Sequence, residues 1–460
     1  MVTLNRKDDG YRGIWYRNQP SNDEYVFKYS GGLATYCAKH QPFAVYAKKV
    51  QKTFFCYGGT LRDDYQKLCH MVSYYDHISG TVPKPTMLLD KHTYDAHDNP
   101  VISLDSYGYI WIFSTSHGTS RPSYVHRSVK PYDIDQIERV PATRLVDGEQ
   151  VPFDNFSYMQ VWNVPGRGFA AFLTHYDDPA IRTSFFISSR DGVNWSEWQR
   201  LAAIEQGHYQ ISAAHEEKVA SAFNFHPADK QPGLNWRTNL YYIESSDFSN
   251  WSSVGGEALA CPLTDVANPA LVHDYQKEGL NVYLKDIQFD NTGNPIILYL
   301  TSAGYQAGPG NAPRTWTIAH WNGKSWDIRP AMQSDSNYDM GSLYVEGDGV
   351  WRIIAPTETG PQPFNPGGEV AMWVTEDYGA TWDRIMNLTS KSEYNHTYVR
   401  RPVNAHPDFY ALWADGHARK PSPSRIYFCN REFNVRILPE EITDDFVQPL
   451  PVVDAGKPRG

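Results

Sequence analysis

The amino-acid sequence predicts an all-β fold in a single domain, a seven-bladed β-propeller, from two observations. A hairpin pattern recurs along the chain, with starts roughly 50 to 75 residues apart, and this repeat length suits propeller blades. Each hairpin is followed by a second pair of strand-like segments, and no stretch shows a helical period of useful length. The predicted blades cover residues 31–90, 97–150, 156–200, 207–260, 281–330, 337–390 and 395–440, and residues 441–460 form a tail that closes the ring or wraps its outside.

Residues 97–117, HDNPVISLDSYGYIWIFSTSH, show the hairpin pattern in the second blade. Two apolar runs, Val101–Leu104 and Tyr109–Ser114, flank a turn that contains Asp105, Ser106 and Gly108. Small and polar residues of these types are what tight turns need. The other six hairpins are expected to turn near residues 48–51, 165–168, 216–218, 291–293, 346–349 and 406–408.

Turns that resemble Asp boxes follow several of these hairpins. Thr375–Trp382 is the clearest and Ser189–Trp195 is a second, while Ser245–Trp251 and Trp321–Trp326 are looser matches. The Ser, Thr and Asp side chains accept hydrogen bonds from turn amides, Gly permits a positive φ, and Trp packs between sheets. These turns indicate architecture and not chemistry.

Composition narrows the class of partner. The formal net charge is −10, which is the opposite of the balance usual in nucleic-acid-binding proteins, so no nucleic-acid partner is expected. Aromatic residues make up 14% of the chain, and such side chains favour strands and stack on sugars. An acidic polymer would therefore need a local basic patch on this protein.

Cysteine content and hydropathy argue against a disulfide-rich scaffold and against a membrane-spanning protein. The five cysteines include no CxxC pair, which predicts buried free thiols, although a single disulfide such as Cys37–Cys56 stays open. No stretch is long and apolar enough to span a membrane. The polar start MVTLNRKDDG is no signal peptide, which fits either a cytoplasmic protein or a mature chain that has been given a new Met.

The ends of the hairpins carry residue types that can do chemistry. In a propeller these ends surround the channel mouth on one face, so side chains at equal distances from each turn meet there. A lone histidine is more often structural than catalytic, but recurrence at one topological position in several blades favours a shared site. The residues expected around this mouth are His97, His117, Tyr158, His175, His208, His226, Lys285, Tyr338, His396 and His417.

A second series places arginines just before the third strand of several blades. Arg182, Arg237, Arg314 and Arg425 occupy this position, and Arg121 is a looser match. One interpretation is a set of salt bridges between blades. The other is a cationic collar that binds a carboxylate.

The combination of His, Tyr and Arg fits β-elimination from a uronic acid. A cation must neutralise the carboxylate so that charge can develop, one side chain must remove the C5 proton, and another must protonate the leaving O4. His97, His117 and Tyr158 are the candidates for the two proton transfers. Ordinary glycosidases use a pair of carboxylates, whereas the rim residues Asp98, Asp339 and Asp415 have the contexts of turn and cap aspartates.

The chain resembles the BNR-repeat propeller family that contains ulvan lyases, L-rhamnose-α-1,4-D-glucuronate lyases and a group of α-L-rhamnosidases. The blocks that carry this resemblance span nearly the whole chain and include DGYRGIWY (9–16), GGLATYCAKHQPFAVYA (31–47), KTFFCYGG (52–59), HDNP (97–100), SHGTSRP (116–122), RTNLYY (237–242), NYDMGSLY (337–344), GPQPFNPGGEVAMW (360–373) and YVRRPVN (398–404). The later blocks look closest to the rhamnose–glucuronate branch. The resemblance implies a secreted or periplasmic protein.

The resemblance implies that His97, His117 and Tyr158 are the catalytic residues of a lyase. Lyases of this kind tend to carry an Arg on the strand that returns from the tyrosine, but here that strand reads FLTHY. The neutralising role then passes to Arg182, Arg237 or a metal ion. The rhamnosidase branch is thought to use a lone His on the opposite face, and the first turn on that face, Lys48–Gln51, contains none.

We expect an enzyme that cleaves the L-rhamnose-α-1,4-D-glucuronate linkage of arabinogalactan or gum-arabic-type glycans by β-elimination and releases rhamnose. Two alternatives stay open: an α-L-rhamnosidase that hydrolyses the same linkage, and a non-catalytic propeller that binds acidic glycans. Few features of the sequence indicate a cofactor. Ca²⁺ in or near the central channel suits rim carboxylates and carbonyls, and clustered histidines could equally hold zinc.

Overall fold

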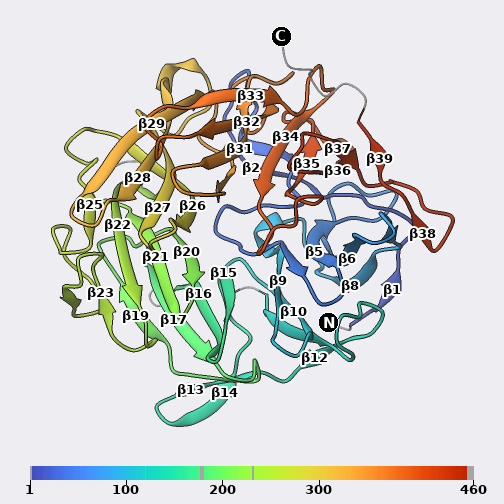
Figure 1. The fold of residues 1–460 in the computed structure, drawn as a ribbon, viewed down its shortest axis with the longest axis horizontal. Coiled ribbons are helices and arrows are strands. Elements are labelled where there is room, and N and C mark those ends of the chain that lie inside the picture. The colour runs from blue at the N-terminus through green and yellow to red at the C-terminus, as the bar shows by residue number, and fades with distance from the viewer. Residues whose placement is uncertain (1–2, 120, 177–180, 230–232, 453–460) are drawn as a thin grey trace.

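The computed structural model describes residues 3–119, 121–176, 181–229 and 233–452, and it forms an all-β propeller in a single domain (Figure 1). The sheets are arranged around a central axis, with the chain following the ring from blade to blade. The first three blades contain β4 (Ala44–Ala47), β5 (Lys52–Gly59), β6 (Cys69–Asp76) and β8 (Thr86–Asp90); β9 (Pro100–Leu104), β10 (Ile110–Ser114), β11 (Tyr124–Ser128) and β12 (Ile137–Val140); and β15 (Ser157–Val164), β16 (Gly168–Tyr176), β17 (Arg182–Ser189) and β19 (Gln199–Ala202).

The later sheets follow the same order along the chain. They contain β20 (Gln210–His215), β21 (Lys218–Phe225), β22 (Thr238–Ser245), β23 (Trp251–Ser252), β24 (Ala258–Leu259) and β25 (Leu271–His273); β26 (Asn281–Phe289), β27 (Pro295–Ser302), β28 (Arg314–Trp321) and β29 (Trp326–Ser334); β30 (Ser342–Val345), β31 (Trp351–Glu358), β32 (Glu369–Thr375) and β33 (Asp383–Asn387); and β34 (Asn395–Arg400), β35 (Ala411–Gly416), β36 (Ile426–Cys429), β37 (Val435–Ile437) and β39 (Leu450–Pro451).

The predicted count of seven blades is wrong. Within the described residues, eight sheets have three or more strands, and the additional one joins β14 (Glu149–Pro152), β13 (Thr143–Val146) and β18 (Asn194–Trp195). A tight turn builds this extra hairpin, because Asp147 and Gly148 have φ of 50° and 85°, the geometry that an Asp-Gly pair favours. The hairpin then pairs in parallel with the Asp-box strand of the next blade, a contact that sequence periodicity does not reveal.

Smaller elements extend the ring. Two two-stranded sheets pair β2 (Trp15–Pro20) with β3 (Phe27–Gly32) and β7 (Val82–Pro83) with β38 (Phe446–Val447), while β1 (Arg6–Lys7) pairs with β8. The short helices are η1 (Ala96–Asp98), η2 (Gly233–Asn235) and η3 (Pro309–Asn311). The β2–β3 hairpin packs against β34 and β35, which places the start of the chain beside the last blade.

The ring closes between its first and last blades. Val45 in β4 and Val403 after β34 form a parallel bridge, and the Ile442 amide donates to the Asp9 carbonyl at 2.6 Å. The predicted tail contributes β38 and β39, while its residues 453–460 lie outside the described part of the chain. All five cysteines are free, as expected.

Bulges in the inner strands aim side chains at the channel. The pairing of β15 with β16 shifts register between Ser157 and Gln160, and Tyr158 within the shift has φ of +52°. The pairing of β34 with β35 shifts in the same way, and Tyr398 there has φ of +49°. A bulge turns a residue away from the regular alternation of a strand, so both tyrosines face the same pocket.

Apolar side chains between the sheets supply the core. One cluster packs Leu298 of β27, Trp316 of β28, and Trp351 and Ile353 of β31, all of them without solvent exposure. The Asp-box turns work as expected from the sequence, since the Asp377 carboxylate accepts from the Thr381 amide at 2.9 Å.

Shortening Ile353 tests this packing. We expect Ile353→Ala to lower the free energy of unfolding by about 2–5 kcal/mol, because it leaves a cavity in a fully buried cluster. The matched control is Ile385→Ala, where the side chain is 42% exposed and the change is expected to stay within about 0.5 kcal/mol. Denaturant titration of both variants measures the difference, and equal shifts would contradict this account of the core.

Candidate active site

The structure brings together the three residues predicted to be catalytic. His97 lies in η1 before β9, His117 follows β10, and Tyr158 lies in the neighbouring inner strand β15. The two imidazoles stack with centroids 4.1 Å apart and planes 19° apart. The Tyr158 hydroxyl lies 3.4 Å from Nε2 of His117. The hairpin of residues 97–117 therefore does place its two histidines at the same end of the sheet.

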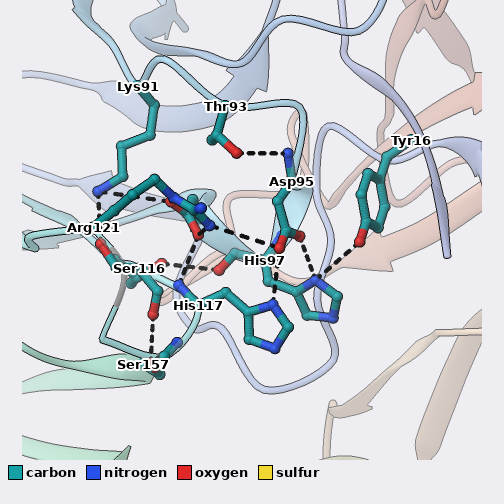
Figure 2. Close-up of polar contacts among 12 residues, drawn as sticks. Tyr16, Lys91, Thr93, Asp95, His97, Ser116, His117, Arg121 and Ser157 are labelled. Carbon is teal, nitrogen blue, oxygen red and sulfur yellow. Dashed lines mark hydrogen bonds and ion pairs between the residues drawn. The ribbon is translucent and has the colours of Figure 1, made fainter.

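A carboxylate that sequence reasoning missed holds both rings. Asp95 lies 2.5 Å from Nδ1 of His97 through one oxygen and 2.8 Å from Nδ1 of His117 through the other (Figure 2). Asp95 is also the N-cap of η1, where its side chain accepts from the His97 amide. A cap aspartate two residues before a histidine was the available sequence signal.

The electrostatics of this trio fix the proton positions. Burial favours a raised pKa for Asp95, but interaction with His97 and hydrogen bonds from both rings hold that pKa well below its usual range. Burial lowers the pKa of His97, with the nearby charge of Asp95 acting in the opposite direction. An ionised Asp95 accepts a hydrogen bond from the Nδ1–H of each ring, so a neutral ring presents its Nε2 as an acceptor.

The two rings then differ in what their Nε2 atoms face. His97 is 5% exposed, and its Nε2 lies 2.6 Å from the hydroxyl of Tyr36 and 3.0 Å from that of Tyr29. His117 keeps 30% of its side chain exposed, and its Nε2 faces Tyr158. His117 is therefore the ring that can reach a bound molecule.

Asp98, expected from the sequence to be a cap residue, positions His117. Its carboxylate accepts from the His117 amide at 2.7 Å and from Nε of Arg121 at 2.7 Å. Lys91 is completely buried beside it at 4.0 Å, and burial lowers the pKa of Lys91 to about 8. Arg121 also lies 3.7 Å from Asp95, so these two cations compensate the charges of buried Asp98 and half-buried Asp95.

A pocket lined by basic and aromatic side chains opens beside Tyr158. Its lining includes Tyr29, Tyr36, Tyr158, Tyr209, Tyr283, Tyr338, Tyr398, Lys28, Lys39, Arg237 and Lys285. None of the described residues that line it is acidic. Burial, with the like charges of Arg237 and Arg182, lowers the pKa of Lys28 to about 7. Burial also lowers the pKa of Lys285 to about 7. Such a pocket suits an anion.

Tyr209, which sequence reasoning did not single out, connects the cations to Tyr158. Its ring centroid lies 5.7 Å from that of Tyr158. The guanidinium groups of Arg237 and Arg182 lie 4.6 Å and 4.9 Å from the same ring, and the Lys39 ammonium lies 5.7 Å from it. Two predicted substrate-binding arginines therefore converge a short distance from the predicted catalytic tyrosine.

The structure brings two other predicted binding residues into the same pocket. Lys285 lies at a bulge of β26 and donates to the Asn337 carbonyl at 2.9 Å. The Tyr338 ring lies 4.6 Å from that of Tyr29, which comes from the β2–β3 hairpin. The hairpin also carries Tyr16, whose hydroxyl lies 3.4 Å from Nδ1 of His97, so it forms one wall of the site.

Arg182, which contacts the Tyr209 ring, and four further residues predicted to bind substrate lie outside this pocket lining. Arg314 is 1% exposed and donates to the carbonyls of Gln306 and Gly308, so its charge orders a loop. His208 is held between the Ile204 amide and the Asn224 carbonyl.

The remaining two pack against neighbouring side chains. Nδ1 of His226 lies 2.8 Å from the Trp236 carbonyl, and its ring packs against Tyr209. The His175 ring packs against Trp198, 4.4 Å away.

Two clusters of described residues combine donors of the types that bind metals. One is Asp95, His97 and His117, whose ligand atoms already hydrogen-bond to one another, and the other is His77, His406 and Asp408. The pocket beside Tyr158 carries cations, so its chemistry favours an anion over Ca²⁺. Calcium elsewhere in or near the channel stays a prediction.

Comparison with known proteins places this geometry in context. The sequence is 23% identical to an ulvan lyase of Nonlabens ulvanivorans over 87% of this chain and 88% of the relative. It is also 23% identical to an ulvan lyase of Alteromonas sp. (strain LOR) over 70% of each chain. Within the described residues, no helix is long and apolar enough to cross a membrane.

Solved structures share the fold. A polysaccharide lyase of family PL25, an ulvan lyase, matches with a TM-score of 0.70 at 16% identity, over 92% of this chain and 96% of the other. The same type of enzyme bound to -[GlcA(1-4)Rha3S]- matches with a TM-score of 0.69 at 15% identity, over 93% and 96%. A family model described as BNR repeat-containing family member matches residues 66–334. Because this match covers more than half of the chain, the protein belongs to the BNR repeat-containing family.

Proposed function

We propose that this protein is a polysaccharide lyase of the ulvan lyase type, which cleaves an acidic glycan by β-elimination at a glucuronate. The observation that carries the proposal is the Asp95–His117–Tyr158 arrangement beside a cationic pocket. The two curated relatives named above are ulvan lyases, which supports the same reaction class.

His117 and Tyr158 divide the proton transfers. Asp95 holds the Nδ1 proton of His117, so Nε2 is available to remove the C5 proton of the uronate. The C5–H electrons form the C4–C5 double bond, the bond from C4 to O4 breaks, and the Tyr158 hydroxyl protonates the leaving O4. His97 is buried against Tyr36 and Tyr29, so we assign it the role of holding Asp95 in place.

The cations around Tyr209 neutralise the carboxylate. Proton loss at C5 places negative charge on the adjacent carboxylate, and preorganised donors in a water-poor site stabilise that charge. Arg237 is 7% exposed, and its Nε is buried without a hydrogen-bond partner among the described residues. A bound carboxylate would supply that acceptor. Arg182 and Lys39 lie against the same ring and add to the positive field.

The substrate we propose carries rhamnose on O4 of glucuronate. The ulvan lyase structure bound to -[GlcA(1-4)Rha3S]-, which shares this fold, supports the combination of glucuronate and rhamnose. The order of the linkage is taken from the sequence blocks that resemble the rhamnose–glucuronate branch. Ulvan, which the names of the two curated relatives give as their substrate, and rhamnose-capped arabinogalactan both belong in the first substrate panel.

Product analysis tests the reaction class. We expect digestion of ulvan or gum arabic to generate a new conjugated alkene, seen as ultraviolet absorbance, together with a new rhamnose end. Release of rhamnose without that absorbance would contradict elimination and indicate a hydrolase. Binding without any product would indicate a non-catalytic propeller.

Two conservative variants test the proton-transfer pair. We expect Tyr158→Phe and Asp95→Asn each to lower kcat by about 10²–10⁴ while KM changes little, because the first removes the proposed acid and the second removes the carboxylate that holds the Nδ1 proton of His117. Tyr107→Phe, at a turn where the side chain is 77% exposed, is the matched control and should keep full activity. Full activity in Tyr158→Phe would contradict its assignment as the acid.

The pH dependence of binding tests the pocket. Lys28 is protonated below its pKa of about 7, so the affinity for an acidic oligosaccharide is expected to fall as the pH rises through that value. Calorimetry with the Tyr158→Phe variant separates binding from turnover. Lys28→Met should weaken binding and reduce the pH dependence, of which Lys285 keeps a part, while Lys324→Met, at an exposed turn, should change neither. An affinity that rises with pH would contradict this interpretation.

A further inference from the structure

A second cluster of histidines lies at the opposite end of the strands from the candidate active site. His77 directly follows β6, and its amide donates to the Gln51 carbonyl in the β4–β5 turn at 2.9 Å. His406 and Asp408 lie in the turn between β34 and β35. The active-site histidines instead precede β9 and follow β10, so the two clusters flank opposite ends of the blades.

The three side chains converge although they come from the first and last blades. The imidazoles of His77 and His406 have centroids only 3.9 Å apart. One ligand atom from each of the two rings and from the Asp408 carboxylate lies within 4.8 Å of the others. Tyr46 packs against both rings, at 5.3 Å and 4.8 Å, and holds them together from one side.

His77 is arranged like a metal ligand. Its Nε2 lies 2.8 Å from the Thr53 hydroxyl, which can fix the tautomer that leaves a lone pair on Nδ1. Nδ1 is buried and has no hydrogen-bond partner among the described residues. Metal-binding histidines commonly bond their second nitrogen to an oxygen in this way. A buried acceptor without a partner needs a physical explanation, and a bound cation would supply one.

His406 and Asp408 complete the donor set. Nδ1 of His406 accepts from the Asp408 amide at 3.1 Å and lies 3.7 Å from the Asp408 carboxylate. This hydrogen bond lies in an exposed turn. Replacing it with a bond from Nδ1 of His406 to a metal ion therefore requires only a local change of the turn. The Asp408 side chain is 59% exposed, which gives an ion a route from solvent.

We propose that His77, His406 and Asp408 bind one divalent transition-metal ion, with Zn²⁺ as the expected occupant. Two imidazoles and one carboxylate match the ligands that zinc prefers and suit Ca²⁺ or Mg²⁺ poorly. The ion would bind without any change in oxidation state and would join the first blade to the last. Since Val45 and Val403 already bridge these blades, the metal adds a second link at the point where the ring closes.

Zinc titration of the full-length protein tests the site. After treatment with a chelator, calorimetry with Zn²⁺ is expected to give one strong site per chain, and Zn²⁺ should raise the melting temperature. His406→Ala, in an exposed turn, should abolish both effects. Thr53→Val, which keeps the side-chain shape, should weaken binding by about 10–100-fold.

The matched control for His406→Ala is His117→Ala, which disrupts the only other such cluster in the described part of the chain. His117→Ala should keep the zinc site. No strong binding by the wild type, or strong binding that survives His406→Ala, would overturn the proposal. Circular dichroism of His406→Ala shows whether the variant has lost only the site or the whole fold. If the fold is lost, Asp408→Asn replaces it as the test, and an unchanged zinc affinity in Asp408→Asn would overturn the proposal.

Discussion

The carboxylate of Asp95 is the contact on which the candidate active site depends. It accepts from two imidazoles at once, at 2.5 Å and 2.8 Å, and so sets the orientation and the tautomer of both rings. The two rings stack 4.1 Å apart, and without this carboxylate nothing would hold the proton on Nδ1 in both of them. The arrangement leaves one ring, His117, with a basic nitrogen directed toward Tyr158.

The propeller makes this contact possible by joining elements that lie far apart in sequence. Tyr16 and Tyr29 come from an N-terminal hairpin, Asp95 and His97 from a short helix at the start of a blade, and Tyr158 from a bulge in the next inner strand. A positive φ at Tyr158 turns its ring into the channel. The same pocket gathers Lys28, Lys39, Arg237 and Lys285 with no acidic side chain in its described lining, although the protein as a whole carries a net charge of −10.

Sequence reasoning recovered the propeller and the meeting of His97 with His117, because both follow from strand periodicity and from equal distances to a turn. It missed the extra sheet. The Asp147–Gly148 turn was a local signal for the β13–β14 hairpin, but the parallel pairing of β13 with β18 across two blades leaves no local pattern. It also missed Asp95, for which a cap aspartate two residues before a histidine was the only signal, and Tyr209, whose importance comes from its neighbours in space. His208 and Arg314 occupy expected positions in the repeat, yet nearby backbone groups use their polar atoms, which periodicity does not encode.

The chemistry assigned to Asp95, His117 and Tyr158 is tested most directly by the fate of solvent oxygen. Digestion in water enriched with heavy oxygen, followed by mass spectrometry of the fragments, distinguishes elimination from hydrolysis at the cleaved bond. Elimination takes no oxygen from water, so the account predicts fragments of unchanged oxygen mass with a double bond at the new non-reducing end. Fragments that carry one heavy oxygen for each cleavage, and no double bond, would contradict it.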